Sequence, residues 1–164
     1  RAFIRKYPQK SLGQLRKWTT DSNVHVRRLV SEGARPRLPL CAPLEQFKKD
    51  PRSIIELLDL LKDDRDLYVR RSVSNNLNDI SKDNPEMLIQ LLDKWKMNAT
   101  KERLWVIRHA LRTLFKKGNK NALALLGYGK PDIDDVQLSL LTNIVPTKGT
   151  LEFSTKFLSK NLFL

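Results

Sequence analysis

Hydrophobic residues recur through the first two thirds of the chain at the spacing of helices that bury one face. In one such set Ile54 and Ile55 lie four and three residues before Leu58, and Leu61 lies three residues after it. A short Asp-rich turn follows, and the next set has spacings of four, four and three: Val69, Val73, Leu77 and Ile80. The pattern predicts a pair of helices joined by that turn.

The helix pair is repeated. Residues 25–33 recur 43 positions later as residues 68–76, each copy with a Val-Arg-Arg core, and residues 105–108 align on 68–71. The first helices of the pairs are expected to start near Pro8, Pro51 and Pro85, because proline suits the first turn of a helix. The second helix of the third pair is expected at about Leu104–Lys117, and a short fourth piece begins within residues 121–126.

A period near 40 residues made of helix pairs is typical of HEAT-like repeats, in which each unit buries its apolar face by stacking on its neighbours. The predicted fold is therefore all-α, a right-handed α-α superhelix of HEAT-like repeats. Residues 33–43 hold too many prolines for a helix. They form a predicted loop between the first two units.

The pattern changes period after residue 131. Residues 136–140 and 151–157 alternate apolar and polar side chains on either side of a Pro-Thr-Lys-Gly turn, which predicts two strands. We therefore expect a helical region over residues 1–130 and a short C-terminal β segment, with its linker, over residues 131–164.

The chain is strongly basic, with 31 Lys and Arg against 18 Asp and Glu and a net charge of +13. A sequence pI near 10.1 favours an anionic partner, nucleic acid first, over a merely solvated basic surface. The single cysteine, Cys41, excludes a disulfide framework and a Cys-rich zinc site. We expect Cys41 to be a packing residue rather than a catalytic thiol.

No apolar run has the length of a membrane span, and no apolar segment of a signal peptide follows Arg1. The chain starts without methionine and within an expected helix, so we expect an internal fragment of a longer, cytoplasmic protein.

The second helices carry a polar stripe beside their apolar face. On a helical wheel of the second unit, Arg71, Ser72, Asn75 and Asp79 share one sector. The equivalent positions in the first and third units include Arg28, Glu32, Arg108, His109, Arg112 and Lys116. We expect these side chains to form a basic wall on a concave face suited to a phosphate backbone, with Glu32 and Asp79 embedded in it.

The two carboxylates have two interpretations. Either they pair a neighbouring arginine, or they act in catalysis by stabilising positive charge on a sugar or activating a water. Wheel positions alone favour pairing. Trp18 and Trp95 are expected in the core, whereas Tyr68 and Trp105 stay open as stacking residues. The two isolated histidines predict no metal site.

Three long motifs resemble the bacterial DNA alkylation-repair glycosylases built from HEAT-like repeats, in particular the AlkC-type branch. They lie at residues 23–39, 67–83 and 108–118. The resemblance, which covers about residues 1–130, implies a monofunctional, cofactor-free and metal-free glycosylase. Such an enzyme removes N-alkylated purines such as 3-methyladenine from double-stranded DNA, and we expect it to act as a monomer.

The resemblance also implies roles for individual residues. Asp79 lies in the matching Asn-Asp-Ile motif and is the expected catalytic carboxylate, which reverses the preference from wheel positions. Glu32, Arg35 and Arg37 are expected to shape the site or hold DNA. The other expected DNA-binding residues are Arg28, Arg71, Asn75, Asn76, Trp105, Arg108, His109, Arg112 and Lys116.

The sequence departs from the family pattern at Leu40, where an Arg-Leu-Pro-Trp loop is expected to end in tryptophan. The N-terminal repeats expected in the family are also missing, and the β segment resembles the first strands of an immunoglobulin-like domain. Two alternatives to the glycosylase stay open. One is a DNA-binding HEAT scaffold without catalysis, which Leu40 favours, and the other is a HEAT module that binds an acidic peptide.

Overall fold

The computed structural model describes residues 1–129, 133–142 and 144–159. The chain divides into two compact units, Arg1–Gly127 and a second unit that begins at Tyr128. Each unit is described by itself.

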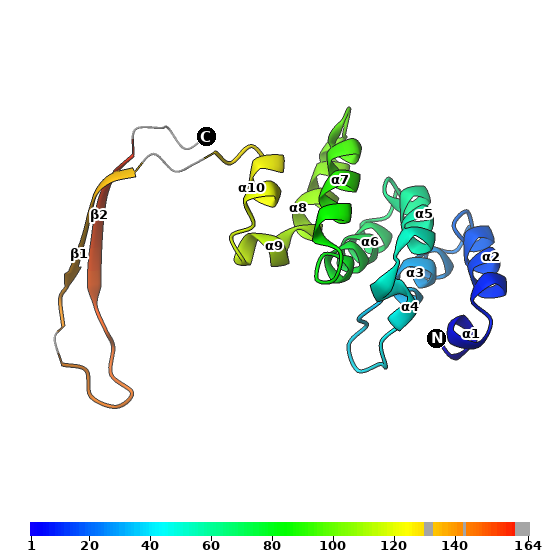
Figure 1. Ribbon diagram of the computed structural model, residues 1–164, viewed down its shortest axis with the longest axis horizontal. Coiled ribbons are helices and arrows are strands. Elements are labelled where there is room, and N and C mark those ends of the chain that lie inside the picture. Colours follow the sequence, from blue (N-terminus) through cyan, green and yellow to red (C-terminus); the bar gives the residue numbers. More distant parts are fainter. Residues whose placement is uncertain (130–132, 143, 160–164) are drawn as a thin grey trace. The chain divides into compact units, whose positions relative to one another are not determined.

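The first unit is a stack of helices that follow one another in chain order (Figure 1). The helices are α1 (Ala2–Lys6), α2 (Pro8–Trp18), α3 (Val24–Gly33), α4 (Glu45–Lys49), α5 (Arg52–Leu61), α6 (Leu67–Ile80), α7 (Pro85–Lys96), α8 (Lys101–Ala110), α9 (Arg112–Lys116) and α10 (Lys120–Leu125). The second helices of the pairs, α3, α6 and α8, pack side by side, and α2, α5 and α7 pack on them. The predicted all-α superhelix of HEAT-like repeats is confirmed.

The centre of this stack is α6, which lies between α3 and α8. Nine of its fourteen residues are buried. Four of them are the predicted apolar face, and five are polar: Ser72, Ser74, Asn76, Asn78 and Asp79. The polar side chains of a helix covered on both sides need hydrogen-bond partners in neighbouring elements or in the helix itself, because an unpaired buried polar group costs about 1–3 kcal/mol.

The structure corrects the predicted helix over residues 104–117. The helix starts earlier, at Lys101, and Leu111 separates α8 from α9. In an unbroken helix the amide of Thr113 would donate to the carbonyl of His109. Here the Thr113 amide donates to the side chain of Asn78 at 3.2 Å, and the guanidinium of Arg112 donates to the His109 carbonyl at 2.8 Å. Side chains have therefore taken both partners of that hydrogen bond.

The two predicted strands are confirmed as an antiparallel pair, β1 (Ile133–Leu140) and β2 (Phe153–Ser159). Leu140 pairs with Phe153, and a bulge interrupts the register between Asp134 and Gln137. Because side chains alternate between the two faces of a strand, Leu138, Leu140, Phe153 and Phe157 share one face, and all four are exposed. The match of this segment to an immunoglobulin-like domain stays a prediction.

A buried ion cluster joins the first two helix pairs. The guanidinium of Arg27 binds Asp64 at 2.7 Å and Asp66 at 2.6 Å, and it also donates to the backbone carbonyls of Asp21 and Ser22. Burial works against ionisation of Asp64, but the hydrogen bond and charge of Arg27, the backbone amide of Asp66 and the charge of Arg65 together outweigh it and keep the pKa of Asp64 below its usual value. Arg27 thus joins the turn before its own helix to the turn of the second helix pair.

We predict that Arg27→Met lowers the free energy of unfolding by about 3 kcal/mol, because it leaves Asp64 buried without its cation. Urea denaturation measures the change. Arg70→Met is the matched control, since Arg70 occupies the equivalent position but, within the part of the chain that the structure describes, donates only to the backbone carbonyls of Asp64 and Arg65. Equal losses in the two variants would contradict this account.

Candidate active site and nucleic-acid interface

The two arginines of each Val-Arg-Arg motif have different surroundings. The first arginines, Arg27 and Arg70, donate to backbone carbonyls of the turns before their helices. The second arginine Arg71 is exposed, and so is Arg108 at the equivalent position of the third copy. Arg28 lies 4.3 Å from the centre of the Tyr68 ring and donates to the Tyr68 hydroxyl at 2.7 Å. The sequence held a signal for this division, because the third unit has Ile107 in place of the first arginine, and Ile107 is fully buried.

The polar stripe runs from the surface into the interface between helices. Along α6, Arg71 is exposed, Asn75 is half-buried, and Ser72 and Asp79 are buried. The predicted wall is therefore exposed only in part, and its two carboxylates lie where α6 meets the first helix pair.

The structure brings Glu32 and Asp79 together through Arg35. The Nε of Arg35 donates to Asp79 Oδ2 at 2.9 Å, and its Nη1 donates to Glu32 Oε1 at 2.8 Å. The side chain of Asp79 is only 2% exposed, and Lys82 donates to its other oxygen at 3.2 Å. Sequence reasoning missed Lys82, although it lies three residues from Asp79 and so on the same side of the helix end.

Glu32 is held in its ionised form. Partial burial works against its charge, but hydrogen bonds from Ser72 and Arg35 and the nearby charges of Arg35 and Arg28 outweigh burial and lower the pKa of Glu32. The Ser72 hydroxyl donates to Glu32 Oε2 at 2.7 Å and accepts from the Ser31 hydroxyl at 2.7 Å. At neutral pH the site therefore holds an anionic Glu32 fixed by α3 and α6.

The loop after α3 is fastened beside these carboxylates. Arg37 binds both oxygens of Asp83, at 2.7 and 2.6 Å, and Arg1 donates to the backbone carbonyls of Arg35 and Ala42. At its tip Leu40 is fully exposed, with a positive φ of 59° that is strained for a side chain of this kind. Cys41 is exposed, so the prediction that it is a packing residue is wrong.

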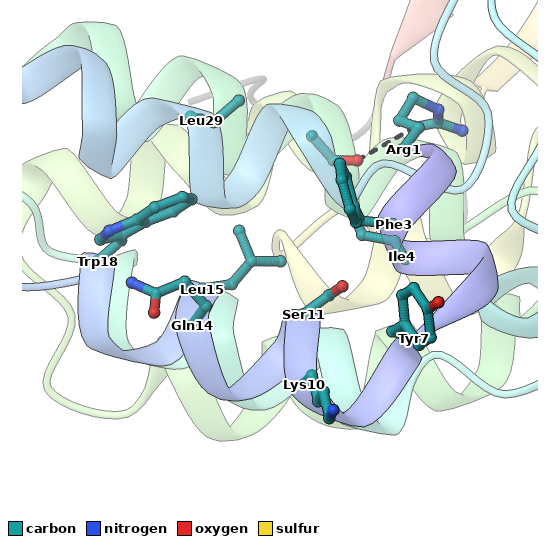
Figure 2. Close-up of a pocket in the computed structure, with 11 residues that line it drawn as sticks. Arg1, Phe3, Ile4, Tyr7, Lys10, Ser11, Gln14, Leu15, Trp18 and Leu29 are labelled. Carbon is teal, nitrogen blue, oxygen red and sulfur yellow. Dashed lines mark hydrogen bonds between the residues drawn. The ribbon is translucent and has the colours of Figure 1, made fainter.

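Arg1 also lines an apolar groove of about 680 Å³ between α1, α2 and α3 (Figure 2). Phe3, Tyr7 and Trp18 contribute its aromatic wall. Of the two tryptophans expected in the core, Trp95 is buried, and Trp18 is half-buried along this groove.

A second group of predicted residues meets around α8 and α9. The rings of Trp105 and His109 stack with their centres 4.9 Å apart, and the guanidinium of Arg112 donates to Asn75 Oδ1 at 3.0 Å. Burial first, and then the charges of Arg112 and Arg71, lower the pKa of His109. His109 is thus a neutral, stacked ring at pH 7. Lys116 is exposed at the end of α9.

The prediction that Asn76 contacts DNA is wrong. Its side chain is fully buried and donates to the backbone carbonyl of Ser31 at 2.8 Å, which joins α6 to α3. The other predicted site residues all lie on or beside the second helices of the three units or on the loop that follows α3.

Neither a metal-binding cluster nor a helix able to cross a membrane is found within residues 1–129, 133–142 and 144–159. The first statement refers to groups of three or more His, Cys, Asp or Glu side chains. The second refers to helices of sufficient length and hydropathy.

Comparison with known proteins gives three findings. Residues 1–114 match the DNA alkylation repair enzyme family. The Bacillus subtilis protein YhaZ is 46% identical over 142 residues, which are 87% of this chain and 39% of that protein. The Pseudomonas fluorescens alkylpurine DNA glycosylase AlkC, solved bound to DNA containing an abasic site analog, is 43% identical with a TM-score of 0.74.

The AlkC match covers 83% of this chain and 38% of that one. AlkD2 from Streptococcus mutans is also similar, at 35% identity and a TM-score of 0.56, over 67% of this chain and 51% of that one. The chain thus spans less than two fifths of the length of YhaZ and AlkC.

The lowered pKa of His109 predicts a stability change with pH. In the unfolded chain this histidine takes up a proton near pH 6.5, whereas in the folded protein it does so only at lower pH. The unfolded state therefore binds more protons as the pH falls from 7.5 to 5.5, and folding is destabilised. We expect His109→Gln to lose less stability than the wild type between these pH values in chemical denaturation. An equal loss would mean that His109 protonates with the same pKa in both states.

Proposed function

The chain belongs to the DNA alkylation repair enzyme family, and on that premise we propose that it forms part of a DNA glycosylase that releases N-alkylated purines of the 3-methyladenine type. The observation that carries this proposal is the pair of carboxylates, Glu32 and Asp79, held together by Arg35 beside exposed cations of α6 and α8. If these carboxylates only paired with an arginine, one of them would be enough. A second carboxylate next to a surface that suits phosphates therefore points to another role.

The chemistry follows from the charge of the lesion. An N-alkylated purine is cationic and leaves readily, so the bond to the sugar breaks with little help from an acid. Positive charge then develops on the sugar ring, and a fixed anion close to it stabilises that charge more than it stabilises the starting substrate. We assign this role to Asp79, whose buried charge acts on the sugar through space rather than by contact, with Glu32 supporting the anionic site and helping to place the attacking water.

The interface supplies the second half of the function. Arg71 and Arg108 are exposed on the second helices, and Arg28 is held against Tyr68. These arginines, with Arg37, Arg112 and Lys116, are proposed to contact phosphates of double-stranded DNA, while Asn75, Trp105 and His109 line the same surface. DNA as substrate implies a cytoplasmic location in a bacterium, and the monomeric state stays an expectation.

A non-catalytic DNA-binding scaffold is the second candidate, and Leu40 is the observation that favours it. Leu40 stands where the family resemblance leads us to expect tryptophan, so a cation–π contact worth about 0.5–2 kcal/mol would be missing. The exposure of Leu40 at the loop tip is equally consistent with an apolar side chain that meets DNA in place of the aromatic ring.

We predict that Asp79→Asn reduces the release of 3-methyladenine from duplex DNA about a hundredfold or more at saturating protein, because the developing sugar cation loses its anion. Single-turnover assays measure the rate. Asp83→Asn is the matched control, since Asp83 also pairs with an arginine of the loop but lies four residues further on. A folded wild type that binds DNA without releasing the base would support the scaffold.

We predict that Arg71→Gln weakens DNA binding and reduces the slope of log K against log salt by about 0.9, the value for one lost phosphate contact. Fluorescence titrations at several salt concentrations measure both quantities. Arg52→Gln serves as control, because Arg52 is an exposed arginine of the other helix layer, on α5. The same loss of slope in both variants would contradict the assignment of the interface to the second helices.

A further inference from the structure

Arg35 connects the two carboxylates of the site. Its side chain is only 10% exposed, and its Nε and Nη1 reach different carboxylates that come from α3 and α6. A guanidinium is planar and presents its donors in a fixed fork, so it sets the orientation of the two acids as well as their charge.

The backbone around Arg35 is itself fixed by hydrogen bonds. Arg1 donates to the Arg35 carbonyl at 2.7 Å and to the Gly33 carbonyl at 3.3 Å. The neighbouring loop is closed by the amide of Leu44, which donates to the Pro36 carbonyl at 3.0 Å. The side chain therefore extends from a fixed point into the interface between the first two helix pairs.

We infer that Arg35 is a positioning residue, which holds Asp79 and Glu32 as an oriented pair of anions and does not contact DNA. The inference rests on the proposed glycosylase function and changes the expected role of Arg35 as a DNA-binding residue. A buried guanidinium with two carboxylate partners has its charge satisfied within the protein, and the exposed arginines of the second helices are better placed to bind phosphates.

Lys82 does not replace Arg35. It donates to Asp79 from the turn after α6, and its side chain is more than a third exposed. Its hydrogen bond to Asp79, at 3.2 Å, is longer than that of Arg35, at 2.9 Å. A flexible ammonium gives Asp79 a counter-charge but no fixed direction. The buried position of Asp79 therefore depends on Arg35.

Other charged groups surround the pair. Arg28 lies 3.5 Å from Glu32 on α3, and Lys82 lies beside Asp79. Arg1, Arg37 and Arg112 are within electrostatic reach of Asp79 from α1, the loop and α9. These cations remain when Arg35 is replaced by glutamine, so a change in titration of that variant reports the hydrogen bonds and the charge of Arg35 itself.

The test compares the pH dependence of single-turnover base release in wild type and Arg35→Gln. Without Arg35 the Glu32 carboxyl loses a hydrogen bond and a charge that lower its pKa, so we expect the acidic limb of the profile to move up by about one pH unit or more. We also expect a rate loss of at least about tenfold at neutral pH, with the Kd for DNA within about threefold of wild type.

Arg37→Gln is the matched control, two residues along the same loop and also paired with an aspartate. As a proposed phosphate contact it should raise the Kd and lower the salt slope, and it should leave the acidic limb in place. If Arg35→Gln behaves in this way instead, Arg35 is a DNA contact and the inference is overturned.

Arg35→Lys guards against a variant that does not fold. Its single ammonium keeps the charge but cannot reach both carboxylates in the fork geometry, so the acidic limb should still move, by less than in Arg35→Gln. Circular dichroism checks the fold of each variant. A lysine variant with the wild-type profile would overturn the inference, because charge alone would then suffice.

Titration of the Glu32 carboxyl by ¹³C NMR in the DNA-free protein separates this inference from the proposed function. Arg35→Gln should raise the midpoint of Glu32, whether or not the wild type releases bases. A raised midpoint with an inactive wild type would end the glycosylase proposal but keep the link between Arg35 and Glu32. An active wild type with an unmoved midpoint and limb in Arg35→Gln would overturn the inference alone.

Discussion

The structure depends on the buried polar contacts between α3 and α6. Because α6 is covered on both sides, several of its polar side chains find partners in the first helix pair and the loop that follows it. Asn76 donates to the Ser31 carbonyl, Ser72 accepts from Ser31 and donates to Glu32, and Arg35 reaches Asp79. Apolar packing alone would let one helix slide along the other, whereas hydrogen bonds at fixed positions select one register. That register places the two carboxylates beside each other.

The sequence was sufficient to predict the helix pairs, their period and the two strands, because these follow from local spacing. The sequence was not sufficient to predict the contacts between two neighbouring helix pairs. A helical wheel shows that Ser72 and Asp79 are off the apolar face, but it does not show that the first helix pair covers that side as well. The break at Leu111 also depends on a neighbouring helix pair. The Asn78 side chain, on α6, accepts from the Thr113 amide, and the Arg112 side chain donates to the His109 carbonyl that this amide would otherwise bind.

The network around Asp79 bears on both interpretations of the carboxylates. Asp79 and Glu32 do pair with an arginine, as the wheel positions favoured. Yet a buried ion network is seldom more stabilising than well-packed apolar side chains of the same volume, because each charge loses its hydration. Three charged groups in contact at one interface are therefore an expensive way to join two helices, and pairing explains their geometry without explaining their presence.

The same reasoning separates this network from the Arg27 cluster. Arg27 also binds two aspartates, but it donates as well to two backbone carbonyls of the turn before α3, so the cluster has a complete structural role. Arg35 makes no such contact from its guanidinium among the described hydrogen bonds, and both of its carboxylates lie beside the basic stripe. A charge network that closes no turn and borders a cationic surface has the properties of a site, because its remaining function is to keep two anions where DNA would approach.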